Sequence, residues 1–148
     1  MENEPFRVAL SASFKQSDGT MTYPTFDLIP LKNIETIEVR FLTSGDPIRR
    51  EELEDCDALI LLSEKFTTQS IPSSGRLSII ARFGVGYDTV EVEACTKNSI
   101  AVCITPDGVR RPVAVSILTL MLSLSGKLLI KDRLARNGPA GFASRSEH

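Results

Sequence analysis

The chain has 148 residues, 42% of them hydrophobic and 24% charged, a composition typical of one globular domain rather than of a disordered or fibrous chain. Its net charge of −2 gives no electrostatic reason to expect nucleic acid or an anionic membrane as a partner. The acidic N-terminus is unlike a secretory or mitochondrial signal, and the longest charge-free stretch, 112–126, is too short to cross a bilayer. These features predict a soluble, cytoplasmic domain.

Cysteine and histidine exclude several kinds of site. Cys56, Cys95 and Cys103 are odd in number and form no Cys-x-x-Cys pair, so neither a disulfide framework nor a zinc site is expected. The single histidine, His148, is the last residue. The sequence therefore predicts no metal site and offers no evident histidine general base.

Short apolar runs recur along the chain and alternate with helical patches. The inner runs are continuous in Val, Ile and Leu, which is typical of strands covered on both faces of a parallel sheet. Strand–helix alternation of this kind predicts an α/β fold with a doubly wound parallel sheet. The five predicted strands are Arg7–Ser13, Ile34–Phe41, Asp57–Leu62, Leu77–Arg82 and Ile100–Ile104.

Capping signals predict short helices between these strands. A helix over 46–54 is expected because Asp-Pro begins it, and one over 88–97 because Asp88 and Glu91 form a capping-box-like pair. Residues 71–75 predict a short helix that ends in a turn. The long connection 15–33 contains two prolines and is expected to be either a lid or an unrecognised helix.

The last predicted helix is apolar nearly all round. It is expected over 109–137, where Pro112 can begin it and Asn137-Gly138-Pro139 can stop it. Such a helix is normally buried on every side, and one five-stranded sheet covers only one side. We therefore expect a sheet domain over 1–108, the helix, and a polar tail over 138–148 where a second layer should begin.

The loop after the fourth predicted strand is the first candidate site. Its two glycines, Gly84 and Gly86, let backbone amides approach an anion closely. A dinucleotide fingerprint is disfavoured, because Thr89 stands where the third glycine should be and Asp107 lies in a predicted turn. A phosphoacceptor domain is disfavoured because Glu64, not an aspartate, follows the third strand. A structural turn and a small-anion site both stay open.

Two arginines near the start of the last helix are the second candidate. Arg110 and Arg111 oppose the helix dipole there, which suggests that an anion or a carboxylate lies nearby. Two solvated arginines on a loop remain an equal alternative.

Taken together, these motifs resemble a known family. Arg82-Phe83-Gly84-Val85-Gly86-Tyr87-Asp88, then Ile100-Ala101-Val102, Thr105-Pro106, Pro112-Val113-Ala114 and a long apolar helix resemble the D-isomer-specific 2-hydroxyacid dehydrogenases, the phosphoglycerate dehydrogenase-like family. The resemblance covers essentially the whole chain as that family's N-terminal, substrate-binding lobe. It implies a flavodoxin-like sheet with strand order 2-1-3-4-5, followed by an interdomain helix.

The resemblance also implies roles for individual residues. Phe83, Gly84, Val85 and Gly86 would bind the carboxylate of a small 2-keto or 2-hydroxy acid, and Val85 would contact the nicotinamide of NAD or NADP. Arg110 and Arg111 are candidate anion contacts. The family's dinucleotide-binding domain and its catalytic arginine, glutamate and histidine come later in the family's chain, and His148 does not occupy the position of that histidine.

Two departures from the family pattern are informative. The usual glutamate after Val-Ala is Val115 here, and Leu62-Ser63 stands where relatives acting on phosphorylated substrates tend to carry an arginine. The second departure favours an unphosphorylated substrate.

The leading prediction is a substrate-binding lobe of an NAD(P)-dependent oxidoreductase acting on the CH–OH group of a small 2-hydroxy acid, truncated and inactive alone. The alternative is a free-standing flavodoxin-like domain that binds a small carboxylate or regulates a partner. The resemblance implies that the apolar helix packs against the nucleotide-binding domain; pairing with a full-length dehydrogenase, or with a second copy of this chain as a homodimer, is the alternative, since so large an apolar stripe is seldom left exposed.

Overall fold

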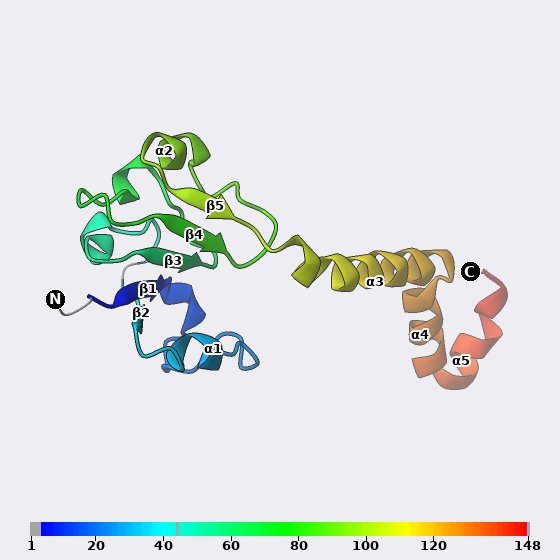
Figure 1. Cartoon of the computed structure of the whole chain (residues 1–148). Coiled ribbons are helices and arrows are strands. Elements are labelled where there is room, and N and C mark those ends of the chain that lie inside the picture. The colour runs from blue at the N-terminus through cyan, green and yellow to red at the C-terminus, as the bar shows by residue number, and fades with distance from the viewer. Residues whose placement is uncertain (1–3, 44, 148) are drawn as a thin grey trace. The chain divides into compact units, whose positions relative to one another are not determined.

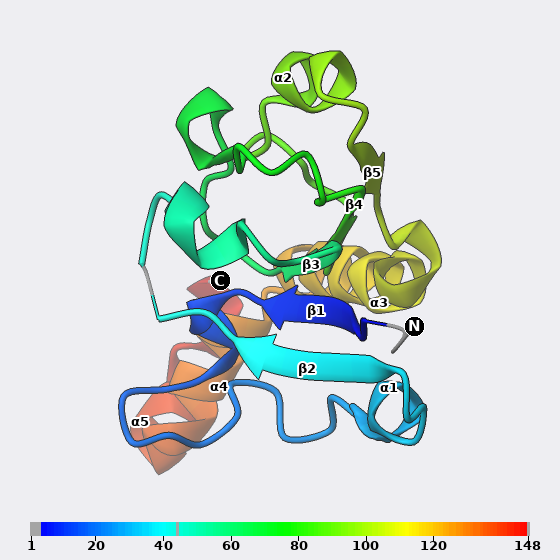
Figure 2. The same ribbon diagram turned by 60° about the vertical axis from the view of Figure 1, so that its left-hand side comes forward.

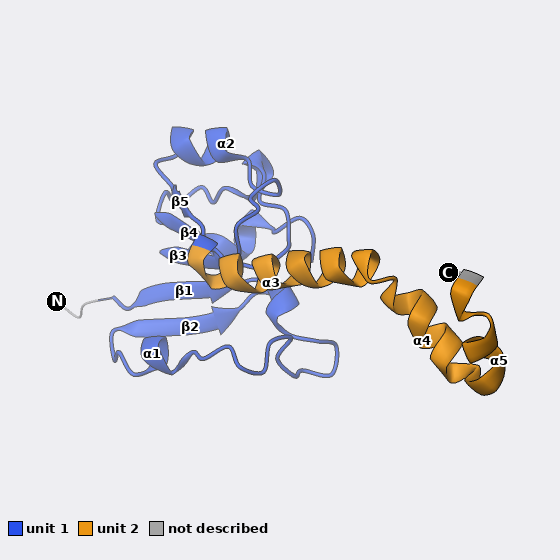
Figure 3. Ribbon diagram, turned by 90° about the vertical axis from the view of Figure 1, so that its right-hand side faces the viewer, with its two compact units in different colours: residues 1–106 blue, residues 107–148 orange. Residues whose placement is uncertain are grey.

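The computed structural model describes residues 4–43 and 45–147 and divides the chain into two compact units, Met1–Pro106 and Asp107–His148 (Figure 3). The first unit holds the sheet and the second is entirely helical. The boundary expected after residue 108 lies two residues beyond the observed division.

All five predicted strands are present, each shorter than its apolar run. They pair in parallel throughout, in the order β2-β1-β3-β4-β5 (Figure 1). This confirms the α/β fold and the flavodoxin-like strand order that the resemblance implies. The strands are β1 Phe6–Leu10, β2 Ile37–Phe41, β3 Ala58–Leu61, β4 Ile79–Arg82 and β5 Ala101–Cys103.

Neighbouring residues of the central strands point to opposite faces of the sheet, and each face has its own core. On one face Leu59, fully buried in β3, packs with a cluster that includes Leu53 and Cys95. On the other face Leu10 packs with Phe14 and Leu28. Because both faces are covered, the central strands have apolar residues at successive positions, as their sequences predicted. Figure 2 shows the strands side by side from β2 to β5.

Two of the predicted helices are shorter than expected. The helix over 46–54 contains only one 3₁₀ turn, η2 (Arg50–Leu53). The helix predicted from Asp88 begins later, as α2 (Val92–Lys97). The capping-box interpretation is wrong because the Glu91 carboxylate is bonded elsewhere: it accepts hydrogen bonds from the backbone N–H and the hydroxyl of Thr68, at 2.8 and 2.7 Å.

The helix predicted over 71–75 is wrong. The helical turn lies just before it, as η3 (Thr68–Ser70), which Thr67 caps with its side chain. Residues 72–75 form a turn instead, and Ser73 and Ser74 donate their backbone N–H groups to Glu54. Polar residues that can bond neighbouring backbone favour such turns over helix interiors.

The long connection between β1 and β2 contains the helix that the sequence left undecided. It begins with the 3₁₀ turn η1 (Ala12–Phe14) and ends with α1 (Ile29–Lys32). Phe26 and Leu31 from this connection pack on the Leu10 face of the sheet. The connection therefore supplies one of the two covering layers of the sheet.

The second unit differs from the single helix expected over 109–137. Helix α3 (Pro106–Ser125) begins earlier, so that Pro112 lies inside it, and α4 (Leu128–Arg136) follows a break at Gly126-Lys127. Lys127 takes a left-handed conformation with φ 51°, which ends a helix. The predicted stop at Asn137 is confirmed, but the expected tail forms α5 (Gly138–Ala143) and the 3₁₀ turn η4 (Arg145–Glu147).

The helices of the second unit leave their apolar side chains exposed. Leu122 is 72% exposed and Leu124 is 77% exposed, and no described residue of α3 or α4 is buried. By length and composition alone α3 could cross a membrane, because it runs through Arg110 and Arg111 to 20 residues. The charge-free stretch 112–126 therefore underestimated the length of α3.

Candidate functional site: the glycine loop after β4

The candidate loop lies at the carboxyl-terminal edge of the sheet, beside the ends of β1 and β3. Phe83 donates its backbone N–H to the carbonyl of Leu61, at 2.8 Å. Ser11, fully buried after β1, donates its N–H to Ile60 at 3.0 Å and accepts the N–H of Leu62 with its hydroxyl at 3.0 Å. In doubly wound sheets ligands bind at this edge.

Gly84 is held inside the molecule on both sides of its α-carbon. Its N–H donates to the carbonyl of Arg82 at 2.9 Å, and its carbonyl accepts the backbone N–H of Thr105, also at 2.9 Å. Its φ of 144° is one that residues with side chains rarely adopt. Gly84 therefore shapes the loop, and its N–H is bonded within the chain rather than free to bind a carboxylate, as the resemblance had implied.

Val85 and Gly86 have the character that the prediction requires. Both residues are exposed, and their backbone N–H groups donate to no other group within the described part of the chain. A Cβ built on Gly86 would meet only Asp88, at 3.8 Å, so the space over this amide is open. Two neighbouring free amide N–H groups can donate hydrogen bonds to a small anion, such as a carboxylate.

Arg82 contributes to this loop in a way that sequence reasoning missed. Its Nη1 donates to the carbonyl of Phe83, and a Cβ on Gly84 would overlap the same nitrogen. Its Nε is buried with no hydrogen-bond partner among the described residues. The sequence feature that could have indicated this role is an arginine at the end of a predicted buried strand, two residues before Gly84.

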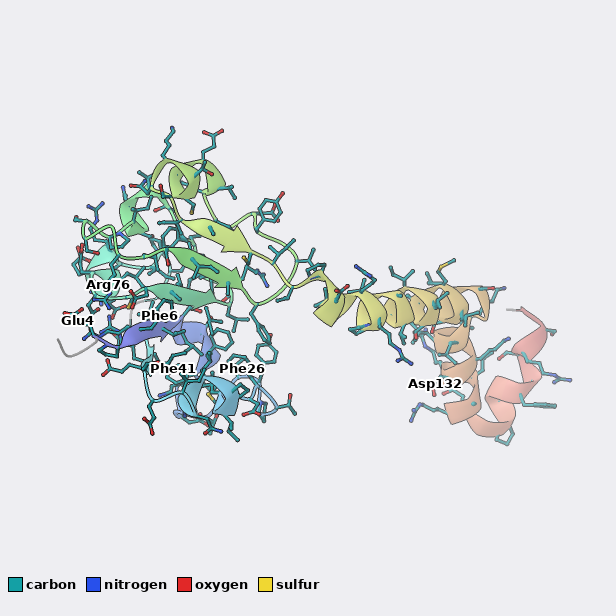
Figure 4. The ribbon with its side chains drawn as sticks, in the orientation of Figure 1. Glu4, Phe6, Phe26, Phe41, Arg76 and Asp132 are labelled. Atoms are coloured by element: carbon teal, nitrogen blue, oxygen red, sulfur yellow. The ribbon has the colours of Figure 1, made fainter. Side chains whose placement is uncertain are left out.

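Phe83 anchors the loop rather than facing solvent. Its ring lies within 5.5 Å, centroid to centroid, of the rings of Phe14, Tyr23 and Phe26, and it meets Phe14 and Phe26 edge to face. Figure 4 labels Phe26 beside α1. Edge-to-face pairs are a favoured aromatic geometry, so the cluster fixes the start of the loop. A substrate-binding role for Phe83 stays a prediction.

A buried carboxylate lies beside the same edge. Glu64, 5% exposed, accepts hydrogen bonds from the N–H and the hydroxyl of Ser13, both at 2.7 Å, and from the N–H of Ser63 at 3.1 Å. Burial raises the pKa of Glu64, but bonds from Ser13 and Ser11 outweigh burial and hold this pKa below its ordinary value. The sequence analysis used Glu64 only to exclude a phosphoacceptor.

The two candidate arginines lie in the helical unit. Arg110 pairs with Asp107 at 2.8 Å, one helical turn earlier, and both side chains are largely exposed. Because α3 begins at Pro106, the arginines lie in its second turn and Asp107 supplies the acidic partner of Arg110. Their role toward an external anion stays a prediction.

The glycine loop does not have the form of a dinucleotide fingerprint. In that motif a helix starts at the glycines and its N-terminus faces the pyrophosphate. Here α2 begins only at Val92 and is six residues long. The loop therefore does not fit a pyrophosphate, and the contact of the exposed Val85 side chain with a nicotinamide stays a prediction. No group of three or more metal-ligating residues occurs within 4–43 and 45–147.

Known proteins resemble this chain in sequence. The profile described as "D-isomer specific 2-hydroxyacid dehydrogenase, catalytic domain" matches residues 25–115, which include the glycine loop. The chain belongs to this family. It is 33% identical over 119 residues to a glyoxylate reductase of Thermococcus kodakarensis, covering 74% of this chain and 36% of that protein. The chain thus spans little more than a third of this relative.

Solved structures share the fold. The apo form of D-mandelate dehydrogenase from Rhodotorula graminis superposes with a TM-score of 0.69 at 21% identity, covering 97% of this chain and 44% of that one. The NAD⁺-bound 3-phosphoglycerate dehydrogenase of Entamoeba histolytica gives 0.59 at 24% identity, covering 80% and 39%. At these identities the likeness establishes the fold alone.

Proposed function

We propose that this chain forms the substrate-binding lobe of an NAD(P)-dependent oxidoreductase that acts on the CH–OH group of a small 2-hydroxy acid. The observation that carries the proposal is the pair of exposed, unpartnered amides of Val85 and Gly86 at the carboxyl edge of the sheet. Their loop lies inside the segment that matches the family. Two amide donors side by side suit the carboxylate of such an acid.

The proposed substrate is unphosphorylated and of the size of glyoxylate, which the relatives' names specify for those proteins. Leu62 and Ser63 follow β3, where relatives that act on phosphorylated substrates tend to carry an arginine, and Lys65 of the same turn lies 4.0 Å from Asp46, Nζ to Oδ2. Small 2-keto acids carry one carboxylate, whose two acceptor oxygens equal in number the two free amide donors. Pyruvate and hydroxypyruvate are the alternatives to test beside glyoxylate.

NAD or NADP is the proposed cofactor, in keeping with the family. When bound, it exchanges a hydride with the carbon that carries the substrate oxygen. Val85 is the residue proposed to contact the nicotinamide, and its side chain is 40% exposed, which supports such a contact. The loop would orient the substrate by its carboxylate, which leaves the 2-oxygen and its carbon free to face the cofactor.

We expect no dehydrogenase activity from this chain alone. The reaction needs a proton donor for the 2-oxygen, and the single histidine of the sequence, His148, does not occupy the position of the family's catalytic histidine. The assay is oxidation of NADH or NADPH by the purified chain with glyoxylate, pyruvate or hydroxypyruvate. Clear turnover would contradict this part of the proposal.

Binding tests the site directly. Titration of ¹⁵N-labelled chain with glyoxylate should shift the amide peaks of Val85 and Gly86 before any others. Glycolaldehyde, which lacks the carboxylate, should leave them in place. If glyoxylate moves no peak in this loop, the proposed site is wrong.

We further propose a cytoplasmic protein that pairs with a second copy through α3 and binds neither nucleic acid nor membrane. The exposed Leu118 and Leu122, one helical turn apart on α3, support pairing. Light scattering over a concentration series should show a dimer that the double variant Leu118→Glu/Leu122→Glu abolishes. A wild-type monomer at all concentrations would refute the pairing. If the chain sediments together with anionic vesicles, it binds membranes and that part of the proposal is wrong.

A further inference from the structure

Glu64 is an unusual charge for the sheet unit. Its side chain is buried, and no described Lys or Arg pairs with it, whereas Asp57 pairs with Arg76 and Asp55 with Arg40. Burying a charge without a counter-ion is costly unless several hydrogen bonds stabilise it. Glu64 is stabilised entirely by the neutral donors of serines and backbone amides.

Those donors come from the two loops beside the candidate site. Ser13 lies in η1 after β1 and donates to both carboxylate oxygens, its N–H to Oε1 and its hydroxyl to Oε2. Ser63 lies in the turn after β3 and donates its N–H to Oε2. One carboxylate therefore ties the ends of two neighbouring strands together at the carboxyl edge of the sheet.

The contact between Glu64 and Ser13 reaches the glycine loop through one more residue. Phe14 follows Ser13 directly, is fully buried, and packs edge to face on Phe83 with ring centroids 5.5 Å apart. Phe83 is the residue before Gly84, and its backbone is bonded to Leu61 of β3. The position of Ser13 thus determines where the rings of Phe14 and Phe83, which pack beneath the loop, lie.

We propose that Glu64 is a positioning residue for the carboxylate site: by holding Ser13 it seats Phe14 against Phe83 and so fixes the direction of the Val85 and Gly86 amides. This inference rests on the proposed function for its consequence in binding, but the link from Glu64 to the loop can be measured without any ligand. Glu64 itself touches no substrate in this account.

The role requires a carboxylate, and an amide of the same shape cannot replace it. A carboxylate accepts on both oxygens, while the glutamine side chain has one acceptor and one donor end. If the NH₂ group takes the place of Oε1, it faces the N–H of Ser13. If it takes the place of Oε2, it faces the N–H of Ser63. Either way a backbone donor loses its acceptor, although side-chain volume is unchanged.

The test compares Glu64→Gln with Glu54→Gln in the full chain. Glu54 is the matched control, because its two oxygens also accept two backbone N–H groups, from Ser73 and Ser74, each at 2.9 Å, ahead of β4. Both variants should lower the melting temperature. Only Glu64→Gln should displace the ligand-free amide peaks of Val85 and Gly86 and raise the Kd for glyoxylate, by at least about fivefold against less than about twofold for the control.

Two variants at Ser13 keep the proposal falsifiable if Glu64→Gln does not fold. Ser13→Ala removes one bond to Glu64 and should move the same two peaks by less. Ser13→Thr keeps the hydroxyl and should restore them. If Glu64→Gln and Ser13→Ala lower stability but leave the peaks of Val85 and Gly86 in place, Glu64 is merely structural and the inference is overturned.

The outcomes separate the two proposals. If the wild-type chain shows no response to glyoxylate, the proposed function fails, yet the ligand-free peaks still decide whether Glu64 positions the loop. If glyoxylate binds equally well to the wild type and to Glu64→Gln, the proposed function stands and the positioning role is wrong.

Discussion

The two units of the chain use apolar residues in opposite ways. In the sheet unit Leu59 and Leu61 are fully buried, as are Leu10 and Phe14 on the other face. In the helical unit Leu122, an equally apolar residue, is 72% exposed. The sheet unit buries its own apolar residues. The helices have the apolar pattern of a buried surface, but their side chains are exposed within the described chain.

Charge separates the two units as well. Residues 1–106 contain sixteen Asp and Glu against ten Lys and Arg, and residues 107–148 contain three against seven. The near-neutral total conceals an acidic sheet unit and a basic helical unit. Within α3 the charged residues, Asp107, Arg110 and Arg111, all lie in its first two turns. The rest of α3, which contains Leu118 and Leu122, is uncharged, so like charge does not oppose pairing of two copies there.

The largest expected effect contrasts one leucine from each unit. Leu59→Ala opens a cavity in the middle of β3 and should cost about 2–5 kcal/mol of unfolding free energy. Leu122→Ala removes an exposed side chain and should change it by less than about 0.5 kcal/mol. Urea denaturation of both variants, followed by circular dichroism, measures the contrast. Similar losses for the two would mean that Leu122 is buried in solution.

A smaller effect is expected within the glycine loop. Gly84→Ala places a side chain at φ 144° and against the Arg82 guanidinium, so it should cost about 1–3 kcal/mol. Gly86→Ala meets no such contact and should cost less than about 1 kcal/mol. Adding Arg82→Met to Gly84→Ala separates the two causes: relief by this second change would trace part of the cost to the guanidinium, and no relief would leave backbone strain alone.

Acid should remove the contribution of Glu64. Because its folded-state pKa lies below the ordinary value of 4.5, its ionised form stabilises the fold above that value, and the contribution falls as pH drops through the lower folded pKa. Glu64→Gln cannot titrate. The stability difference between wild type and Glu64→Gln should therefore be about 1–2 kcal/mol at pH 7 and shrink below pH of about 4. A difference that grows on acidification would contradict the sign of this pKa.

The sequence predicted the sheet well because its strands are continuous apolar runs with one plausible arrangement. It failed where a side chain had a choice of partners: Glu91 looked like a cap for a helix from Asp88 but bonds Thr68 across the fold. The candidate loop was found from its two glycines and from its place between a predicted strand and a predicted helix. The occupied amide of Gly84 and the guanidinium of Arg82 beneath it depend on backbone angles that the sequence does not show.

The contact between Glu64 and Ser13 could not be predicted for the same reason. The two residues are 51 positions apart, and serines occur throughout the chain. Nothing local distinguishes Glu64 from the exposed glutamates near it. Only the parallel pairing of β1 with β3 brings the two turns together, so the sheet had to be known before the contact could be inferred.

The smallest effect is expected where charge is most exposed. Asp107→Asn breaks the pair with Arg110 in α3, where both side chains are mostly exposed to solvent. Exposed pairs contribute little because water screens them, so the melting temperature should change by less than about 2 °C. A shift several times larger, measured by thermal denaturation, would show that Arg110 and Asp107 lie in an interface. The helical unit would then be covered in solution, and the contrast with the sheet unit would disappear.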